Sequence, residues 1–238
     1  MNALVTVMAA PAALFAFMSL GCANQAPAQE PTTQTTAEKR PAPAALPSVA
    51  AVVTHEVNDY ATWKRAFDEH AGSRKSAGIV GTHINISADN PNVVSVYLAA
   101  ADIGSLRAFL GSEDLKATMT RAGVKGPPTV SVITPVEDAT VRDRALPGVI
   151  VVHRVAAYDA WKKAFDGDAS ARSAAGIIGH AVNRSVDDPN VVVVYLQSNT
   201  LDQVRQFTAS PKLKETMQKA GVEGAPKLAF VQGAEWGS

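Results

Sequence analysis

Residues 93–98 read VVSVYL, and residues 191–196 read VVVVYL. Both runs are rich in β-branched residues, which favour strands. A strand with one face in water alternates apolar and polar residues, and neither run does so. We therefore expect these strands to be buried on both faces. If helices cover one face of each sheet, the other face must pack against a second apolar surface.

The two runs belong to an internal duplication. Val52–Ile133 aligns with Ile150–Val231 without a gap, at a constant offset of 98, and 37 of the 82 aligned residues are identical. Two copies are too few for a repeat array, which needs at least about three units to close a core. The duplication therefore predicts two small domains of one fold, each offering its sheet to the other.

Both copies show the same order of secondary-structure signals. Each begins with a short β-branched run, at 52–57 and 150–155. A helical pattern follows, with apolar residues at i, i+3, i+7 and i+11 on one face. We expect this helix to continue to an Ala-Gly-Ile sequence, where Gly78 or Gly176 suits a left-handed terminal position.

Two strands and a second helical region complete each copy. The Asp-x-Pro-Asn sequences at 89–92 and 187–190 predict tight hairpins. The later part of the second helical region starts at Ser112 or Ser210 and stops at Gly123 or Gly221, before a final apolar strand. The order βαββαβ is that of the ferredoxin-like unit.

These signals predict an α+β fold. Two tandem ferredoxin-like βαββαβ units pack sheet to sheet and form an intramolecular pseudo-dimeric α/β barrel. The first unit spans residues 48–136, a charged connector spans 137–146, and the second unit spans 147–238. A monomer is expected, because one chain supplies both halves of the barrel.

The first 47 residues differ in kind from the two copies. Residues 3–20 are almost wholly apolar and lead to Gly21-Cys22, which resembles the lipobox of bacterial lipoproteins. That resemblance implies a signal peptide at 1–22 and lipidation of Cys22. It also implies an extracytoplasmic protein, anchored to a bacterial membrane and facing the periplasm or the cell surface. The alternative is a cleaved secretory signal or a plain anchor with an incidental cysteine. Residues 23–47, rich in Ala, Pro, Thr and Gln, predict a disordered tether.

One motif occurs in both copies and carries a resemblance to a known superfamily. It reads Tyr-x-x-Trp-Lys-x-x-Phe-Asp, followed by Arg, Gly-Ile, Asp-x-Pro-Asn-Val-Val and Leu-Lys-x-x-Met-x-x-Ala-Gly-Val-x-Gly. The pattern resembles the dimeric α/β-barrel superfamily, which includes antibiotic-biosynthesis-monooxygenase-like proteins and small polyketide cyclases. The resemblance covers about residues 48–232. It implies a fold rather than a chemistry, because the shared residues are mostly caps, turns and core positions.

Composition and motifs exclude several classes of function. The 238 residues carry no net charge and no basic cluster, which argues against nucleic acid as a partner. Phosphate-binding glycine loops, the Gly-x-Ser-x-Gly elbow, His-Glu-x-x-His and paired cysteines do not occur in the sequence. No haem-ligand signature occurs either. We therefore expect no cofactor, no metal site and, if there is a partner, a small-molecule ligand.

Polar residues shared by the two copies are candidates for a site. His55 and His153 point with apolar strand neighbours, so each is either a hydrogen-bonded core residue or a proton-transfer group in a cavity. Arg74 and Arg172 extend the apolar helix stripe by one turn. Each either packs its stem there, with its head at the hairpin aspartate or the helix end, or binds an anion or carbonyl of a ligand.

These residues predict two related pockets between the sheet and the first helix. The first set is His55, Arg74, Trp63 and Tyr97, and the second is His153, Arg172, Trp161 and Tyr195. The aromatic residues are otherwise ordinary core residues. Arg184 lies on a neighbouring strand of the second copy, where the first copy has Ile86, and this extra cation favours the second pocket.

Three functions agree with the sequence. The leading hypothesis is a lipid-anchored protein that binds a small apolar or aromatic molecule. The second is a cofactor-independent monooxygenase-like or cyclase-like enzyme with His55 or His153 as a catalytic group. The third is a non-catalytic structural module. An enzyme requires a histidine of perturbed pKa facing a cavity of about 300 Å³ or more. A binding protein requires the cavity without such a histidine, and a structural module predicts no cavity at all.

Overall fold

The structure is a computed structural model, and it describes residues 45–237. The first repeat comprises β1 (Val49–Val57), α1 (Tyr60–Glu69), α2 (Ala71–Ser76), β2 (Ile79–Ser87), β3 (Val93–Ala100), α3 (Ile103–Leu110), α4 (Glu113–Arg121) and β4 (Val124–Asp138). The second comprises β5 (Pro147–Val155), α5 (Tyr158–Gly167), α6 (Ala169–Ala174), β6 (Ile177–Ser185), β7 (Val191–Ser198), α7 (Leu201–Ala209), α8 (Pro211–Lys219) and β8 (Val222–Gly237).

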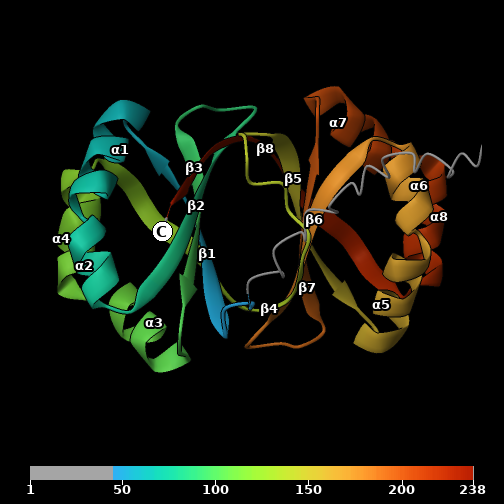
Figure 1. Cartoon of the computed structure of the whole chain (residues 1–238), viewed down its shortest axis with the longest axis horizontal. Coiled ribbons are helices and arrows are strands. Elements are labelled where there is room, and N and C mark those ends of the chain that lie inside the picture. Colours follow the sequence, from blue (N-terminus) through green and yellow to red (C-terminus); the bar gives the residue numbers. More distant parts are fainter. Residues whose placement is uncertain (1–44, 238) are drawn as a thin grey trace, which may run out of the picture. The chain divides into compact units, whose positions relative to one another are not determined.

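The eight strands form one closed barrel in the order β1-β3-β2-β8-β5-β7-β6-β4. Within each repeat the order is that of a ferredoxin-like unit, β4-β1-β3-β2 and β8-β5-β7-β6. The helices cover the outer face of each sheet, and the inner faces meet (Figure 1). The predicted α+β architecture, two βαββαβ units joined into an intramolecular α/β barrel, is confirmed.

The long strands β4 and β8 close the barrel by pairing with both repeats. β4 runs along β1 as far as Ile133 and then continues along β6, where Asp138 lies opposite Ala181. β8 runs along β5 and then along β2, where Trp236 lies opposite His83. Each repeat therefore completes the sheet of the other.

Each sheet has two buried faces. The outer face packs on the helices around Trp63 in the first repeat and Trp161 in the second. The inner face forms a third core, in which Ala50, Ile133 and Val193 are 0–3% exposed. The strands β3 and β7 contribute to an outer and an inner core, which explains why their sequences do not alternate.

The first helix of each repeat differs from the prediction of one continuous helix. It is divided at His70 in the first repeat and at Asp168 in the second, where φ and ψ are −82° and 5°, and −90° and 8°. These angles lie at the edge of the helical region and interrupt the helix. Gly78 and Gly176 have φ of +82° and +83°, as predicted for terminal positions.

No helix within residues 45–237 has the length and apolar character needed to cross a membrane. The predicted signal peptide, Cys22 and most of the tether at 23–47 lie outside the described residues.

Candidate functional site

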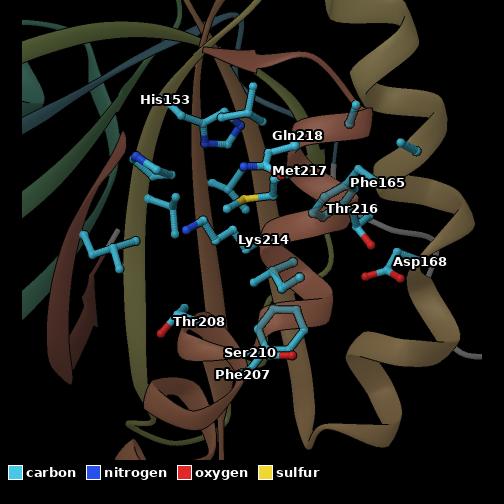
Figure 2. Close-up of a pocket in the computed structure, with 18 of the residues that line it drawn as sticks. His153, Phe165, Asp168, Phe207, Thr208, Ser210, Lys214, Thr216, Met217 and Gln218 are labelled. Atoms are coloured by element: carbon cyan, nitrogen blue, oxygen red, sulfur yellow. The ribbon is translucent and has the colours of Figure 1, made fainter. Parts of the chain in front are cut away.

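A cavity of about 420 Å³ lies between the outer face of the second sheet and the helices α5 to α8. Its lining is mostly apolar, and α8 directs Lys214, Met217 and Gln218 toward the sheet (Figure 2). His153 forms part of the opposite wall, on β5. The volume falls within the range of about 300–1,000 Å³ that is usual for small-molecule sites.

His153 is a polar side chain in the mainly apolar wall of the cavity. Its side chain is 6% exposed, and its ring lies 5.4 Å from the ring of Trp161. Neither ring nitrogen has a hydrogen-bond partner among the described protein atoms. Burial lowers the pKa of His153 from 6.5 to about 4, so the ring is uncharged at neutral pH. An uncharged imidazole offers one donor and one acceptor.

Arg172 supports the wall of the cavity. Its guanidinium stacks on the ring of Phe165 at 3.7 Å and donates to the Phe165 carbonyl oxygen in the last turn of α5. Arg74 makes the same contacts with Phe67 in the first repeat. From the sequence, the head of each arginine could lie at a hairpin aspartate or at the helix end. In the structure, both guanidinium groups lie at the helix end.

The hairpin aspartates instead join the two repeats. Arg107 Nη2, on α3, lies 3.1 Å from Asp187 Oδ1. Arg205 Nη2, on α7, lies 2.8 Å from Asp89 Oδ1. Both pairs are exposed, so their contribution to stability is small. Their symmetry shows that each hairpin turn contacts the third helix of the other repeat.

Three predicted site residues lie outside their expected pockets, and that part of the prediction is wrong: Tyr97 does not line the pocket of His55, and Tyr195 and Arg184 do not line the cavity of His153. Tyr97 and Tyr195 point to the inner face of the barrel, where the Tyr195 hydroxyl donates to Asn85 Oδ1 at 3.2 Å. Burial raises the pKa of each tyrosine to about 12. Arg184 stacks on the ring of Tyr158 at 3.9 Å and binds a hairpin carbonyl. Side chains alternate along a strand, so one residue of register decides which face each occupies.

The first repeat has only a remnant of this cavity, about 60 Å³. His55 stands in its wall with both ring nitrogens unpartnered, and burial lowers its pKa to about 4, as for His153. Leu110 fills space there, and His70 Nε2 lies 2.7 Å from Asp114 Oδ2, which ties the corner between α1 and α2 to α4.

The second repeat lacks both of these closing features. Thr208 replaces Leu110, and Asp168 and Lys212 replace His70 and Asp114. Asp168 and Lys212 form no ion pair in the part of the chain that the structure describes. The second repeat therefore has the larger pocket. The sequence favoured this repeat because of Arg184, but Arg184 does not line the cavity, and the differences lie at positions 168, 208 and 212.

Sequence reasoning missed the contribution of the second helical region. Phe207, Thr208, Leu213, Lys214, Met217 and Gln218 all line the cavity. Leu213, Lys214 and Met217 have identical partners in the first repeat, so identity between copies could have indicated them. The difference in volume between the two cavities depends on packing, which identity does not record.

A second, polar cavity of about 50 Å³ lies inside the barrel. His83 stacks on Trp236 with ring centroids 3.7 Å apart, and His83 Nε2 lies 3.2 Å from Asn85 Oδ1. Burial lowers the pKa of His83 to about 4. This volume is enough for one or a few water molecules and too small for an organic ligand.

Within residues 45–237, no group of three or more His, Cys, Asp or Glu side chains is placed to hold a metal ion. The polar groups of the larger cavity are a neutral imidazole, amides, hydroxyls and separate charges. Such a lining suits hydrogen bonding to an organic ligand.

Solved structures that resemble this chain share its fold. A candidate monooxygenase from Fusobacterium nucleatum matches with a TM-score of 0.56 and 13% identity, over 80% of this chain and 94% of its own. An anthrone oxidase-like protein matches with a TM-score of 0.59 and 11% identity, over 79% and 92%. A candidate monooxygenase from Lactobacillus acidophilus matches with a TM-score of 0.52 and 10% identity, over 79% and 94%.

The sequence matches no family model and no curated protein. At 10–13% identity, the likeness to the solved structures concerns the fold alone. Each match extends over both repeats, since it covers about four fifths of this chain. The chain thus has the tandem ferredoxin-like barrel fold found in monooxygenase-like proteins.

Proposed function

We propose that this protein binds a small, mainly apolar or aromatic molecule in the cavity of the second repeat. One observation carries the proposal: a cavity of about 420 Å³ has an isolated, uncharged histidine in its apolar wall. A buried polar group without a partner costs about 1–3 kcal/mol, and a ligand that hydrogen-bonds to His153 would recover part of that. A purely structural module would have no use for such a cavity.

The two repeats provide a matched test of this proposal. The triple variant Thr208→Leu, Asp168→His and Lys212→Asp gives the second repeat the closing residues of the first. We expect it to weaken binding of the neutral fluorescent probe N-phenyl-1-naphthylamine at least tenfold, because the added leucine and the new clasp fill and close the cavity. Fluorescence titration measures the affinity, and thermal unfolding confirms that the fold is retained.

The reciprocal variant in the first repeat is the control. Leu110→Thr, His70→Asp and Asp114→Lys leave the cavity of the second repeat untouched, so its affinity for the probe should not fall. If the probe binds the wild type and the triple variant of the second repeat with equal affinity, it binds outside this cavity, and the proposal fails.

A second candidate function is cofactor-independent oxidation, and His153 is the observation that favours it. One of the resembling structures is of an anthrone oxidase-like protein. An uncharged imidazole in a mainly apolar site can accept a proton from an activated carbon acid such as anthrone. Anthrone and O2 would then give anthraquinone and water. A cavity with a histidine of perturbed pKa is what the enzyme requires. The shift is downward, however, and a pKa of about 4 makes His153 a weak base at neutral pH, so catalysis ranks below binding.

We also propose that the mature chain is a lipoprotein, with its folded part outside the cytoplasm. The apolar run at 3–20 and the single cysteine that follows it support this proposal. Cys22→Ser is expected to move the protein from the membrane fraction to the soluble fraction, because one residue would carry the whole anchor. Cell fractionation and mass analysis of the mature N-terminus measure the effect. An unchanged distribution without lipid mass would rule the anchor out.

A further inference from the structure

Lys214 lines the cavity and has an identical counterpart, Lys116, in the first repeat. Only the surroundings of the two lysines differ. In the first repeat, Lys116 Nζ lies 2.7 Å from Glu113 Oε1. Lys214 is the equivalent lysine of the second repeat, and Pro211 stands in place of the glutamate. Proline suits the first position of α8 but supplies no carboxylate. Within residues 45–237, no carboxylate oxygen lies within 4.0 Å of Lys214 Nζ.

Across residues 45–237, none of the other charged side chains nearby pairs with Lys214. Glu215 pairs with Lys219 at 2.7 Å on the outer side of α8. Arg172 is held by Phe165. Asp168 lines the cavity from the corner between α5 and α6 and forms no ion pair with Lys214. Lys214 therefore lines the cavity as a cation with no carboxylate partner within 4.0 Å among the described residues.

Two of the polar side chains that line this cavity are exposed to solvent, whereas His153 is buried. Lys214 and Gln218 belong to the exposed side of α8, and both project toward the sheet (Figure 2). His153 and Trp161 are buried in the opposite wall. The mouth thus presents a hydrated positive charge, and the deep wall presents apolar surface and an uncharged hydrogen-bonding group.

We infer that the ligand is an amphipathic anion, with an apolar or aromatic body in the cavity and one carboxylate or similar group against Lys214. The inference rests on the proposed function and specifies its ligand class. An anion at the mouth keeps part of its water, so its desolvation cost is small. A deep anion would meet the uncharged ring of His153, and the buried Arg172 already donates to the Phe165 carbonyl oxygen.

Two fluorescent probes with the same aromatic body test the inference. N-phenyl-1-naphthylamine is neutral, and 8-anilino-1-naphthalenesulfonate carries one sulfonate on that body. The full chain is expected to bind the sulfonate several-fold more tightly at low salt. Lys214→Gln should weaken binding of the sulfonate probe about fivefold, as for the loss of a partly exposed ion pair. The affinity for the neutral probe should change by less than about twofold. Lys214→Arg should retain most of the affinity.

Salt and a matched variant separate this effect from general ones. Raising the ionic strength should weaken binding of the sulfonate probe to the wild type but not to Lys214→Gln, because salt screens exposed charges. Lys116→Gln removes the equivalent lysine of the first repeat and should change neither probe.

The outcomes distinguish the ligand class from the proposed function. If the neutral probe binds in the cavity and Lys214→Gln changes both probes equally, or neither, the anionic ligand is overturned and the cavity function stands. If neither probe binds the wild type, the cavity function and the ligand class both fail.

Discussion

Expressed as separate chains, residues 48–138 and 146–238 are expected to fail to form stable monomers. Each half would lose the pairing of β2 with β8 and of β4 with β6. It would also expose its inner sheet face, including Ile133 or Val193, which are buried in the intact barrel. Soluble monomers rarely expose apolar patches of more than a few hundred Å².

Size-exclusion chromatography with light scattering measures this result directly. Either half alone should dimerise or aggregate, and the two mixed should form a complex with the mass of the intact barrel. The intact chain, run at the same concentration, is the control. Monomeric halves with no affinity for each other would contradict the shared inner core.

Acidification between pH 6.5 and 4 is expected to remove most of the stability of the barrel. Burial lowers the pKa of His55, His83 and His153 from 6.5 to about 4. In this window the unfolded chain binds protons that the folded chain does not, so stability falls as pH falls. It is fully present above about pH 6.5. Each histidine contributes roughly 3 kcal/mol over the window, and the three together approach the whole stability of an ordinary domain.

Urea unfolding at several pH values tests this expectation. The free energy of unfolding should fall with a slope near three protons in the wild type and near two in His153→Gln. The carboxylates with lowered pKa, such as Glu137, act in a lower window, because their contribution is lost only as pH falls below about 4.5. A stability that stays flat from pH 6.5 to 4 would show that the three rings are not held uncharged.

The fold followed from the sequence because several independent patterns agreed. The runs at 93–98 and 191–196 required two buried faces, and the duplication supplied the second apolar surface. Only one arrangement satisfies both: sheets that meet on their inner faces and carry helices on their outer faces. Helix caps then indicated the element boundaries. At Ser112, for example, the side-chain Oγ accepts a hydrogen bond from Leu115 N at 3.2 Å.

The site followed only in part. His153, Trp161 and Arg172 were grouped correctly because β-strand and helix periods place them on one surface. Tyr195 was assigned to the wrong face, since its side relative to His153 depends on the register between β5 and β7. The cavity itself depends on packing, which small changes such as Leu110 to Thr208 alter.

The pairing of β2 with β8 also sets the order in which this chain can fold. Ile84 meets Glu235, about 150 residues later, so the barrel cannot close until the last strand has left the ribosome. Contacts of such high sequence separation are formed slowly, since a long loop must be closed first. Until then, β2 and β5, the two neighbours of β8, present free edges. At high concentration, two chains that exchange their C-terminal halves would satisfy the same edges, so domain-swapped dimers are the expected misfolded product.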